Sequence, residues 1–233
     1  MPLPKVDLPR YKHKLYGSGE ITYRPFTVKE QKILLLSKES DSEEEKVESI
    51  KQILELCTFG KIDVNELPVF DIEDLFIRIR SKSVSEVSEI TYNVKDPETG
   101  KNTGEQVQVS INLDELKVEP KEGHNPLIKI TDSMGIKMRY PSISMMSQGS
   151  EMEEEDLIKE CIELLYDGDE VYNLNEYSKE DINEFYESLN METIQAMSEF
   201  FSTMPRIRHE ENVTLKDGTK ETLVFEGLES FFA

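Results

Sequence analysis

The stretches YGSGEITYRPF at residues 16–26 and IKITDSMGIKMRYPS at residues 128–142 decide the predicted fold. Each places glycine in a turn, continues with alternating strand residues, and then has one aromatic and one basic residue before Pro25 or Pro141. Proline disfavours continuation of a strand and suits the first turn of a helix, so each stretch predicts a hairpin that leads into a helix. The chain therefore has the pattern of two similar halves.

Matching features follow in both halves. We interpret two similar stretches, FDIE at residues 70–73 and LNME at residues 189–192, as corresponding helix starts. A helix and then a terminal hairpin follow each of them, and the two hairpins are expected at residues 90–113 and 213–225. Because the repeated unit is half of the chain, the pattern indicates an internal duplication and not a solenoid. We expect an α+β fold of two related modules, each made of helices flanked by antiparallel β-hairpins.

A polar segment over residues 117–125, with Pro120 and Gly123, is the expected boundary between the modules. The N-terminal module is then 1–122, with an extended arm over residues 1–14, a hairpin, three helices and a long hairpin. The C-terminal module is 123–233, with a hairpin, helices, a second hairpin around Asp217-Gly218 and a short apolar tail.

Capping residues predict where the helices begin. Thr27 with Glu30, and Ser42 with Glu45, have the spacing of capping boxes. The apolar run at residues 33–36 is expected to supply the core face of the first helix. Asp71 is expected to cap the third helix, which runs to Arg80, and Ser178 to cap a later one. The other expected helices cover residues 151–165, 178–189 and 191–203.

The chain is strongly acidic: its 233 residues include 48 Asp or Glu and 27 Lys or Arg, for a net charge of −21. Nucleic-acid binding requires cationic side chains that neutralise phosphates, so this charge argues strongly against it. The charge also disfavours an anionic membrane surface. It favours solubility and could steer a basic protein partner, although solvated helix faces explain it as well.

The two cysteines, Cys57 and Cys161, each occupy an apolar position of an expected helix. We expect buried free thiols in a reducing cytoplasm. The opening residues MPLPK lack the apolar run of a signal peptide, and no stretch approaches a membrane span. An intracellular soluble protein is the resulting expectation.

Residues that carry chemistry are scattered along the chain. His13, His124 and His209 have no Cys or His neighbour at ligand spacing, so packing or solvated histidines are expected. The acidic runs 71–74 and 167–170 lack the alternating loop of a calcium site, and a helix cap and a turn explain them better. The sequence contains no phosphate loop, nucleophile elbow or paired-cysteine motif. We expect a non-enzyme without metal or cofactor.

The first candidate for partner binding is the basic cluster Arg78, Arg80 and Lys82, where cations also suit the end of the third helix. At helical spacing Arg78 and Arg80 fall on the two flanks of the apolar stripe, so their charged ends are expected to reach solvent. The double substitution Arg78→Glu with Arg80→Glu is therefore expected to leave folding intact and to slow the association of a partner.

The second candidate is the aromatic end of the chain, which includes Phe231 and Phe232. These side chains either pack onto the C-terminal module or insert into a groove of a partner.

Several stretches resemble one known family in its own order. They are YRPFTVKE at residues 23–30, FDIEDLFIRIRSKSV at 70–84, RYP at 139–141, YDG at 166–168 and FEGLESFF at 225–232. Together they resemble the baseplate hub assembly proteins of T-even-type contractile-tailed bacteriophages.

The resemblance implies a role in building the phage baseplate hub, with hub or tail proteins as partners. It also implies a location in the host cell cytoplasm during assembly, or in the virion baseplate. An assembly chaperone is the first hypothesis, a stable structural subunit of the baseplate the second, and a carboxylate-based hydrolase the third. Some relatives carry paired cysteines in their hairpins, which indicate a zinc ribbon. The turns at residues 96–104 and 216–219 contain no cysteine here, so the resemblance transfers neither a metal site nor catalytic residues.

Overall fold

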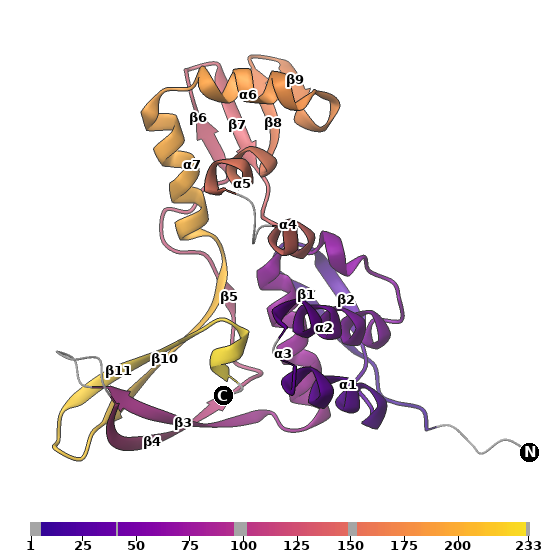
Figure 1. Cartoon of the computed structure of the whole chain (residues 1–233), viewed down its shortest axis with the longest axis vertical. Coiled ribbons are helices and arrows are strands. Elements are labelled where there is room, and N and C mark those ends of the chain that lie inside the picture. Colours follow the sequence, from indigo (N-terminus) through magenta and orange to yellow (C-terminus); the bar gives the residue numbers. More distant parts are fainter. Residues whose placement is uncertain (1–5, 41, 96–101, 149–152, 232–233) are drawn as a thin grey trace, which may run out of the picture. The chain divides into compact units, whose positions relative to one another are not determined.

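The computed structural model describes residues 6–40, 42–95, 102–148 and 153–231 (Figure 1). The chain divides into two compact units: Met1–Glu119 together with Arg206–Ala233, and Pro120–Pro205. The expected boundary after residue 122 lies close to the point where the chain first passes between units. The expected C-terminal module differs from the structure, because the end of the chain belongs to the first unit.

The pairing of two strands explains why the chain returns from the second unit to the first. β5 (Val118–Glu119) and β10 (Arg206–Thr214) pair antiparallel, with Ile207 opposite Val118. Ile207 is buried in the core of the first unit. Such a pairing joins residues that are far apart in the sequence, so local patterns carry no sign of it.

The first unit opens with a hairpin in which β1 (Tyr11–Leu15) pairs with β2 (Gly19–Tyr23). The predicted hairpin is confirmed, but the extended arm predicted over residues 1–14 is wrong from Tyr11 onward. Tyr11 stacks on Tyr23 with 5.6 Å between the ring centroids, and Leu15 is buried. These contacts hold the first strand in place.

Helices follow the hairpin in the predicted order: α1 (Val28–Lys38), α2 (Glu43–Cys57), the 3₁₀ helix η1 (Val64–Glu66) and α3 (Val69–Ser83). Thr27 and Glu30 form the predicted capping box of α1. Ser42 caps α2 by accepting from the backbone N–H of Glu45. α3 begins directly after Pro68, so the prediction that Asp71 caps this helix is wrong.

The orientation of α1 reverses the prediction for residues 33–36. Leu35 and Leu36 are 56% and 68% exposed, whereas the buried residues of α1 are Glu30 and Ser37. The Glu30 carboxylate bonds Arg24 and the backbone of Thr27 on the inner side of the helix. These polar contacts fix α1 with Leu35 and Leu36 on the outside, while Ile33 and Leu34 are half-buried.

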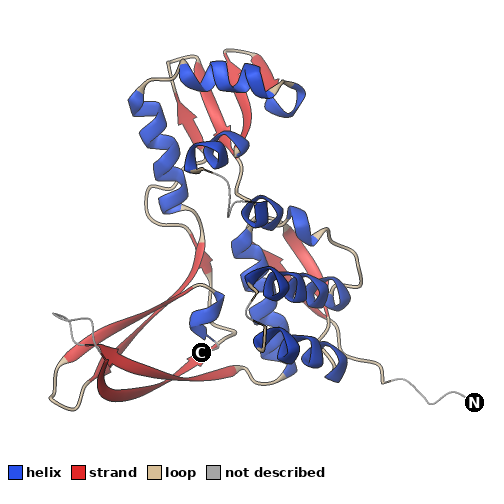
Figure 2. Ribbon diagram, in the orientation of Figure 1, coloured by secondary structure: helices blue, strands red, loops and turns tan. Residues whose placement is uncertain are grey.

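Two long hairpins complete the first unit: β3 (Val87–Lys95) with β4 (Asn102–Asn112), and β10 with β11 (Lys220–Glu226) (Figure 2). β10 lies between β11 and β5 in a three-stranded sheet. The predicted turn at Asp217-Gly218 is confirmed, with Gly218 at φ 87°. The turn predicted from residue 96 begins outside the described residues.

One hydrophobic core joins α3 to both hairpins and to the short C-terminal helix η3 (Leu228–Phe231). Its buried members are Ile77, Ile90, Val109, Ile111, Leu113, Leu116, Ile207, Val213, Leu223, Phe225 and Phe231.

The second unit contains a four-stranded antiparallel sheet in the order β6-β7-β8-β9. Its core combines sheet residues such as Ile136 and Ile162 with helix residues such as Met197 and Phe200. The last helix has the predicted bounds, and the helix capped by Ser178 ends at Glu187. The elements are β6 (Leu127–Lys129), β7 (Met134–Met138), α4 (Ile143–Gln148), α5 (Glu154–Glu160), β8 (Ile162–Asp167), β9 (Glu170–Asn173), the 3₁₀ helix η2 (Leu174–Glu176), α6 (Lys179–Glu187) and α7 (Met191–Thr203).

The helix predicted over residues 151–165 is wrong in its second half. Helix α5 ends at Glu160, and β8 follows from Ile162 as an inner strand of the sheet. Asp167 pairs with Glu170, so Gly168-Asp169 is a two-residue hairpin loop, with Gly168 at φ 60°. A Gly-Asp loop is a recognised hairpin signal that outweighed the apolar helical spacing.

The internal duplication remains a prediction, and the structure adds a correspondence to it. In η1 the Asp63 side chain accepts from the backbone N–H of Asn65, and in η2 Asn173 accepts from Asn175 in the same way. Each short helix precedes a longer one, α3 or α6, whereas the sequence pattern matched the start of α3 with the start of α7. The second unit inserts the β8–β9 hairpin before this shared segment.

Candidate functional site

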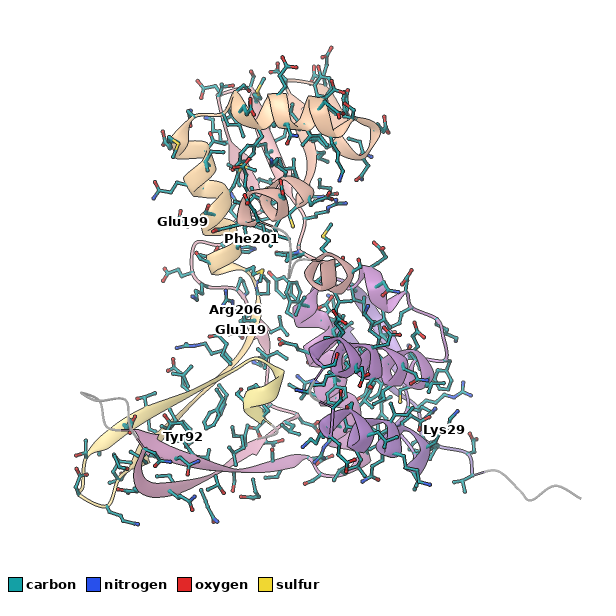
Figure 3. The ribbon with its side chains drawn as sticks, viewed as in Figure 1. Lys29, Tyr92, Glu119, Glu199, Phe201 and Arg206 are labelled. Carbon is teal, nitrogen blue, oxygen red and sulfur yellow. The ribbon has the colours of Figure 1, made fainter. Side chains whose placement is uncertain are left out.

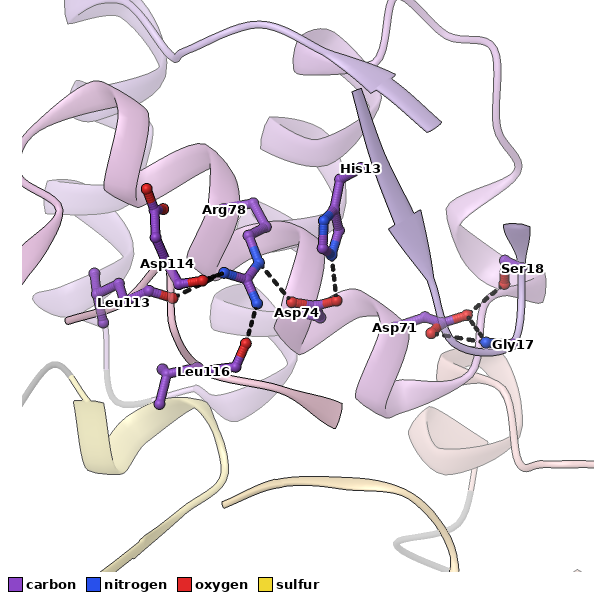
Figure 4. Close-up of polar contacts among 9 residues, drawn as sticks. All are labelled: His13, Gly17, Ser18, Asp71, Asp74, Arg78, Leu113, Asp114 and Leu116. Atoms are coloured by element: carbon purple, nitrogen blue, oxygen red, sulfur yellow. Dashed lines mark hydrogen bonds and ion pairs between the residues drawn. The ribbon is translucent and has the colours of Figure 1, made fainter. Parts of the chain in front are cut away.

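Helix α3 carries a buried polar stripe beside its apolar one. Asp71, Asp74, Arg78 and Ser81 follow one another at intervals of three or four residues, the spacing of a single helix face, and all four are buried. Buried polar groups require hydrogen-bond partners, and these four find them in two other segments of the first unit. Figure 4 shows three of them with most of their partners.

Asp71 holds the turn of the first hairpin. The backbone N–H of Gly17 lies 3.1 Å from both carboxylate oxygens, and the Ser18 hydroxyl donates to Oδ2 at 2.6 Å. Burial raises the pKa of Asp71, while the bonds from Ser18 and Gly17 act in the opposite direction. A Cβ atom on Gly17 would lie 3.0 Å from Asp71 Oδ2, so a larger residue there would push against this carboxylate.

Asp74 bridges the hairpin and the helix. Its Oδ2 lies 2.6 Å from Nε2 of His13 on β1, and its Oδ1 accepts from Nε of Arg78 at 2.9 Å. The pair Asp74–Arg78 is one helical turn apart and buried at both ends, so its charges compensate each other away from solvent.

Arg78 connects α3 to the turn after β4. Its guanidinium donates to the carbonyl oxygens of Leu113 at 2.9 Å, Asp114 at 2.8 Å and Leu116. Ser81 adds a hydrogen bond of 2.6 Å to the Asp114 carboxylate. The polar stripe therefore joins α3 to the hairpin β1–β2 on one side and to this turn on the other.

The expectation that Arg78 presents its charge to solvent is wrong. The residue is 7% exposed, and Asp74 together with three carbonyl oxygens occupies its donors. Arg80 is partly buried, and this burial lowers its pKa. Lys82 bonds Glu86 and Asp114, and these bonds raise its pKa. Arg78 and Lys82 thus connect segments of the first unit, and we now expect Arg78→Glu with Arg80→Glu to destabilise it.

Phe231 belongs to the core of the first unit. It is 0% exposed, its ring lies 6.4 Å from that of Phe225, and its carbonyl accepts from Ser88. Insertion of Phe231 into a partner groove is therefore wrong, and packing within the chain accounts for it. Phe232 lies outside the described residues.

The histidines have packing and hydrogen-bonding roles in the structure. His124 stacks on Tyr140 and lies against Phe200, and its ring nitrogens bond Thr203 and Tyr140. Burial lowers the pKa of His124. His209 lies 3.2 Å from Glu211. Over the described ranges, no group of three or more His, Cys, Asp or Glu side chains could hold a metal ion.

Both cysteines are free and buried, as predicted. Burial raises the pKa of each thiol, Cys57 and Cys161, to about 12. A thiol in this state is almost fully protonated near neutral pH and is a poor nucleophile.

The second unit has a hollow of about 480 Å³ between α5, α6 and β8, and a larger one of about 990 Å³ between β6 and α7. Lys159 in the wall of the smaller hollow lies 2.9 Å from Glu155 and 3.2 Å from Asp156, and Arg139 donates to the backbone carbonyl of Glu160. Lys159 and Arg139 thus have partners within the unit.

The polar stripe of α3 was missed by sequence reasoning. The sequence prediction rests on the apolar stripe of this helix, although Asp71, Asp74, Arg78 and Ser81 have an equally regular spacing of three and four residues. A helix with an apolar and a polar stripe is more typical of one whose polar face meets solvent. The burial of this stripe therefore depends on the hairpin and the turn that cover it.

These observations define an α+β protein of two compact units whose buried charges connect its own structural elements. The chain belongs to the family described as T4 bacteriophage base plate protein, whose model matches residues 5–233. This match confirms the predicted resemblance at the level of the baseplate family. No curated protein and no solved structure gives a significant match to the chain. Among the described residues, no helix has the length and apolarity needed to span a bilayer.

Proposed function

We propose that this baseplate-family protein is an assembly factor without catalytic turnover, which binds baseplate hub proteins and promotes formation of the hub. The observation that carries the proposal is the family match over residues 5–233, essentially the whole chain. The structure supports the part of the proposal that concerns turnover, because the buried ionic groups around α3 bond segments of the chain to one another. On this proposal the protein acts in the host cytoplasm during assembly.

The second candidate is a permanent structural subunit of the virion baseplate. The family description favours it, since that description names the base plate itself. Both candidates require stable contacts with other phage proteins, and they differ in whether the chain stays in the finished particle.

Affinity capture of the tagged chain from infected cells, followed by quantitative mass spectrometry, tests the proposal. We expect baseplate hub proteins to be enriched over capsid proteins of the same phage. Equal recovery of both groups would contradict a baseplate role. A turbidity assay on peptidoglycan tests the non-enzymatic part: lysis by the pure protein that is lost on substitution of one carboxylate would identify a hydrolase.

A further inference from the structure

The outer face of α1 is apolar. Val28, Leu35 and Leu36 are 68%, 56% and 68% exposed. Val28 and Leu35 are seven residues apart, which places them on one face of the helix, and Leu36 is adjacent to Leu35 on that face. Large apolar side chains gathered on one exposed helix face mark an interaction site more often than single exposed ones do.

The inner face of α1 explains why these side chains stay outside. Glu30 is 2% exposed, and its carboxylate bonds Arg24 at 3.0 Å and the backbone N–H of Thr27 at 2.6 Å. Ser37 is 7% exposed and donates to the carbonyl of Leu34. Turning the helix to bury Leu35 and Leu36 would break this ion pair and the capping box, so the first unit itself keeps these two side chains on the outer face.

The charge of α1 indicates the chemistry of that molecule. The helix carries Lys29, Lys32 and Lys38, and its single acidic residue, Glu30, is neutralised by Arg24. Within the described part of the chain, none of the three lysines forms an ion pair. Lys32 lies between Val28 and Leu36 on the exposed face, and Lys29 points away from the helical layer (Figure 3). A basic face in a chain of net charge −21 attracts an acidic partner surface.

We propose that the α1 outer face, formed by Val28, Lys29, Lys32, Leu35 and Leu36, binds an amphipathic helix of a baseplate protein. The bound helix has an apolar stripe flanked by Asp or Glu. Helix side chains at intervals of three and four residues form ridges that fit the grooves of a facing helix. The 11 residues of α1 span roughly 16 Å at about 1.5 Å per residue, which matches three turns of a partner helix. This inference deepens the proposed function and rests on it only for the source of the bound helix.

Fluorescence anisotropy with two synthetic helical peptides tests the proposal on the full chain. Both peptides carry the same leucine stripe, flanked by Glu in one and by Lys in the other. We expect the Glu peptide to bind at least tenfold more tightly. We expect Leu35→Ser with Leu36→Ser to weaken it at least tenfold, and Lys29→Glu with Lys32→Glu to reverse the preference between peptides. Val171→Ser, which alters a 65% exposed valine of the second unit, serves as the matched control and leaves binding unchanged.

Four results would overturn the proposal. Equal affinity for the two peptides would show that charge complementarity does not contribute to binding. Unchanged binding by the leucine variant would show that the peptide binds at another surface. Binding of phosphatidylglycerol vesicles in place of the Glu peptide would assign the face to a lipid surface. Self-association that the leucine variant abolishes, without peptide binding, would assign it to a second copy. Capture of hub proteins from infected cells is measured separately, so failure of the peptides and failure of the proposed function are distinguishable.

Discussion

The backbone N–H of Gly17 points at the carboxylate of Asp71, 3.1 Å from each oxygen, and this contact fixes the first hairpin on α3. The two residues are far apart in the sequence, and neither alone signals the contact. The close approach depends on the absence of a side chain at Gly17, because a Cβ atom there would also lie 3.2 Å from Pro68.

Gly17→Ala is therefore expected to destabilise the first unit by about 1–3 kcal/mol, the usual cost of forcing extra atoms into a packed contact. Urea unfolding followed by circular dichroism measures the change. Lys14→Ala, at an exposed position of the same hairpin, is the control and should change stability by less than about 0.5 kcal/mol. Equal effects of the two substitutions would show that the turn does not pack on Asp71.

Arg78→Ala is expected to cost about 3–5 kcal/mol, because it leaves the buried Asp74 with His13 alone and removes the Arg78 donors from three carbonyls. Lys82→Ala, which removes a more exposed ion pair a turn later, should cost about 0–1 kcal/mol. Denaturant titration of both variants provides the comparison. A folded Arg78→Ala protein of unchanged stability would show that the buried contacts of this arginine do not stabilise the first unit.

Glu30 makes stability depend on pH. Burial alone would raise its pKa, but hydrogen bonds from Arg24 and Thr27 overcome that effect and lower the pKa from 4.5 to about 2. The charged form is thus favoured by folding, so its stabilisation is complete above about pH 5 and is lost as the pH falls toward 2.

The free-energy difference between wild type and Glu30→Gln should accordingly be of order 1–3 kcal/mol at pH 6 and should shrink between about pH 4.5 and pH 2. Thermal or urea unfolding across this range measures it. Glu44→Gln, at an exposed position of α2, serves as the control. Parallel pH profiles for wild type and Glu30→Gln would contradict the account of the capping box.

Phe231→Ala is expected to destabilise the first unit by about 3–5 kcal/mol, because it opens a cavity between the long hairpins. Val224→Ala, in β11 at a 47% exposed position, provides the matched control with a small effect. Urea titration distinguishes the two. A stable Phe231→Ala protein that has lost partner binding would reinstate the aromatic end as a docking element.

Signals carried by short sequence stretches predicted much of the fold. The capping box at Thr27, the caps at Ser42 and Ser178, and the Asp217-Gly218 turn all lie where the sequence placed them. In each case the residues that decide the geometry are within four positions of one another. Local chemistry is therefore sufficient to place these elements.

Features that depend on distant partners were not predicted. β8 is a strand because β7 and β9 flank it, and the last hairpin joins the first unit because β10 pairs with β5. Leu35 and Leu36 of α1 face outward because Arg24 holds Glu30 on the inner side. The same limit applies to Arg78, whose surroundings depend on the turn at Leu113–Leu116, 35 or more positions away.

The most direct test of the central claim is the copy number of this chain relative to baseplate proteins, measured by quantitative mass spectrometry in infected-cell extracts and in purified virions. An assembly factor is expected to accompany hub proteins in the extract and to fall well below one copy per baseplate in the virion. A fixed stoichiometric amount in purified virions would contradict this account and would make the chain a permanent subunit of the baseplate.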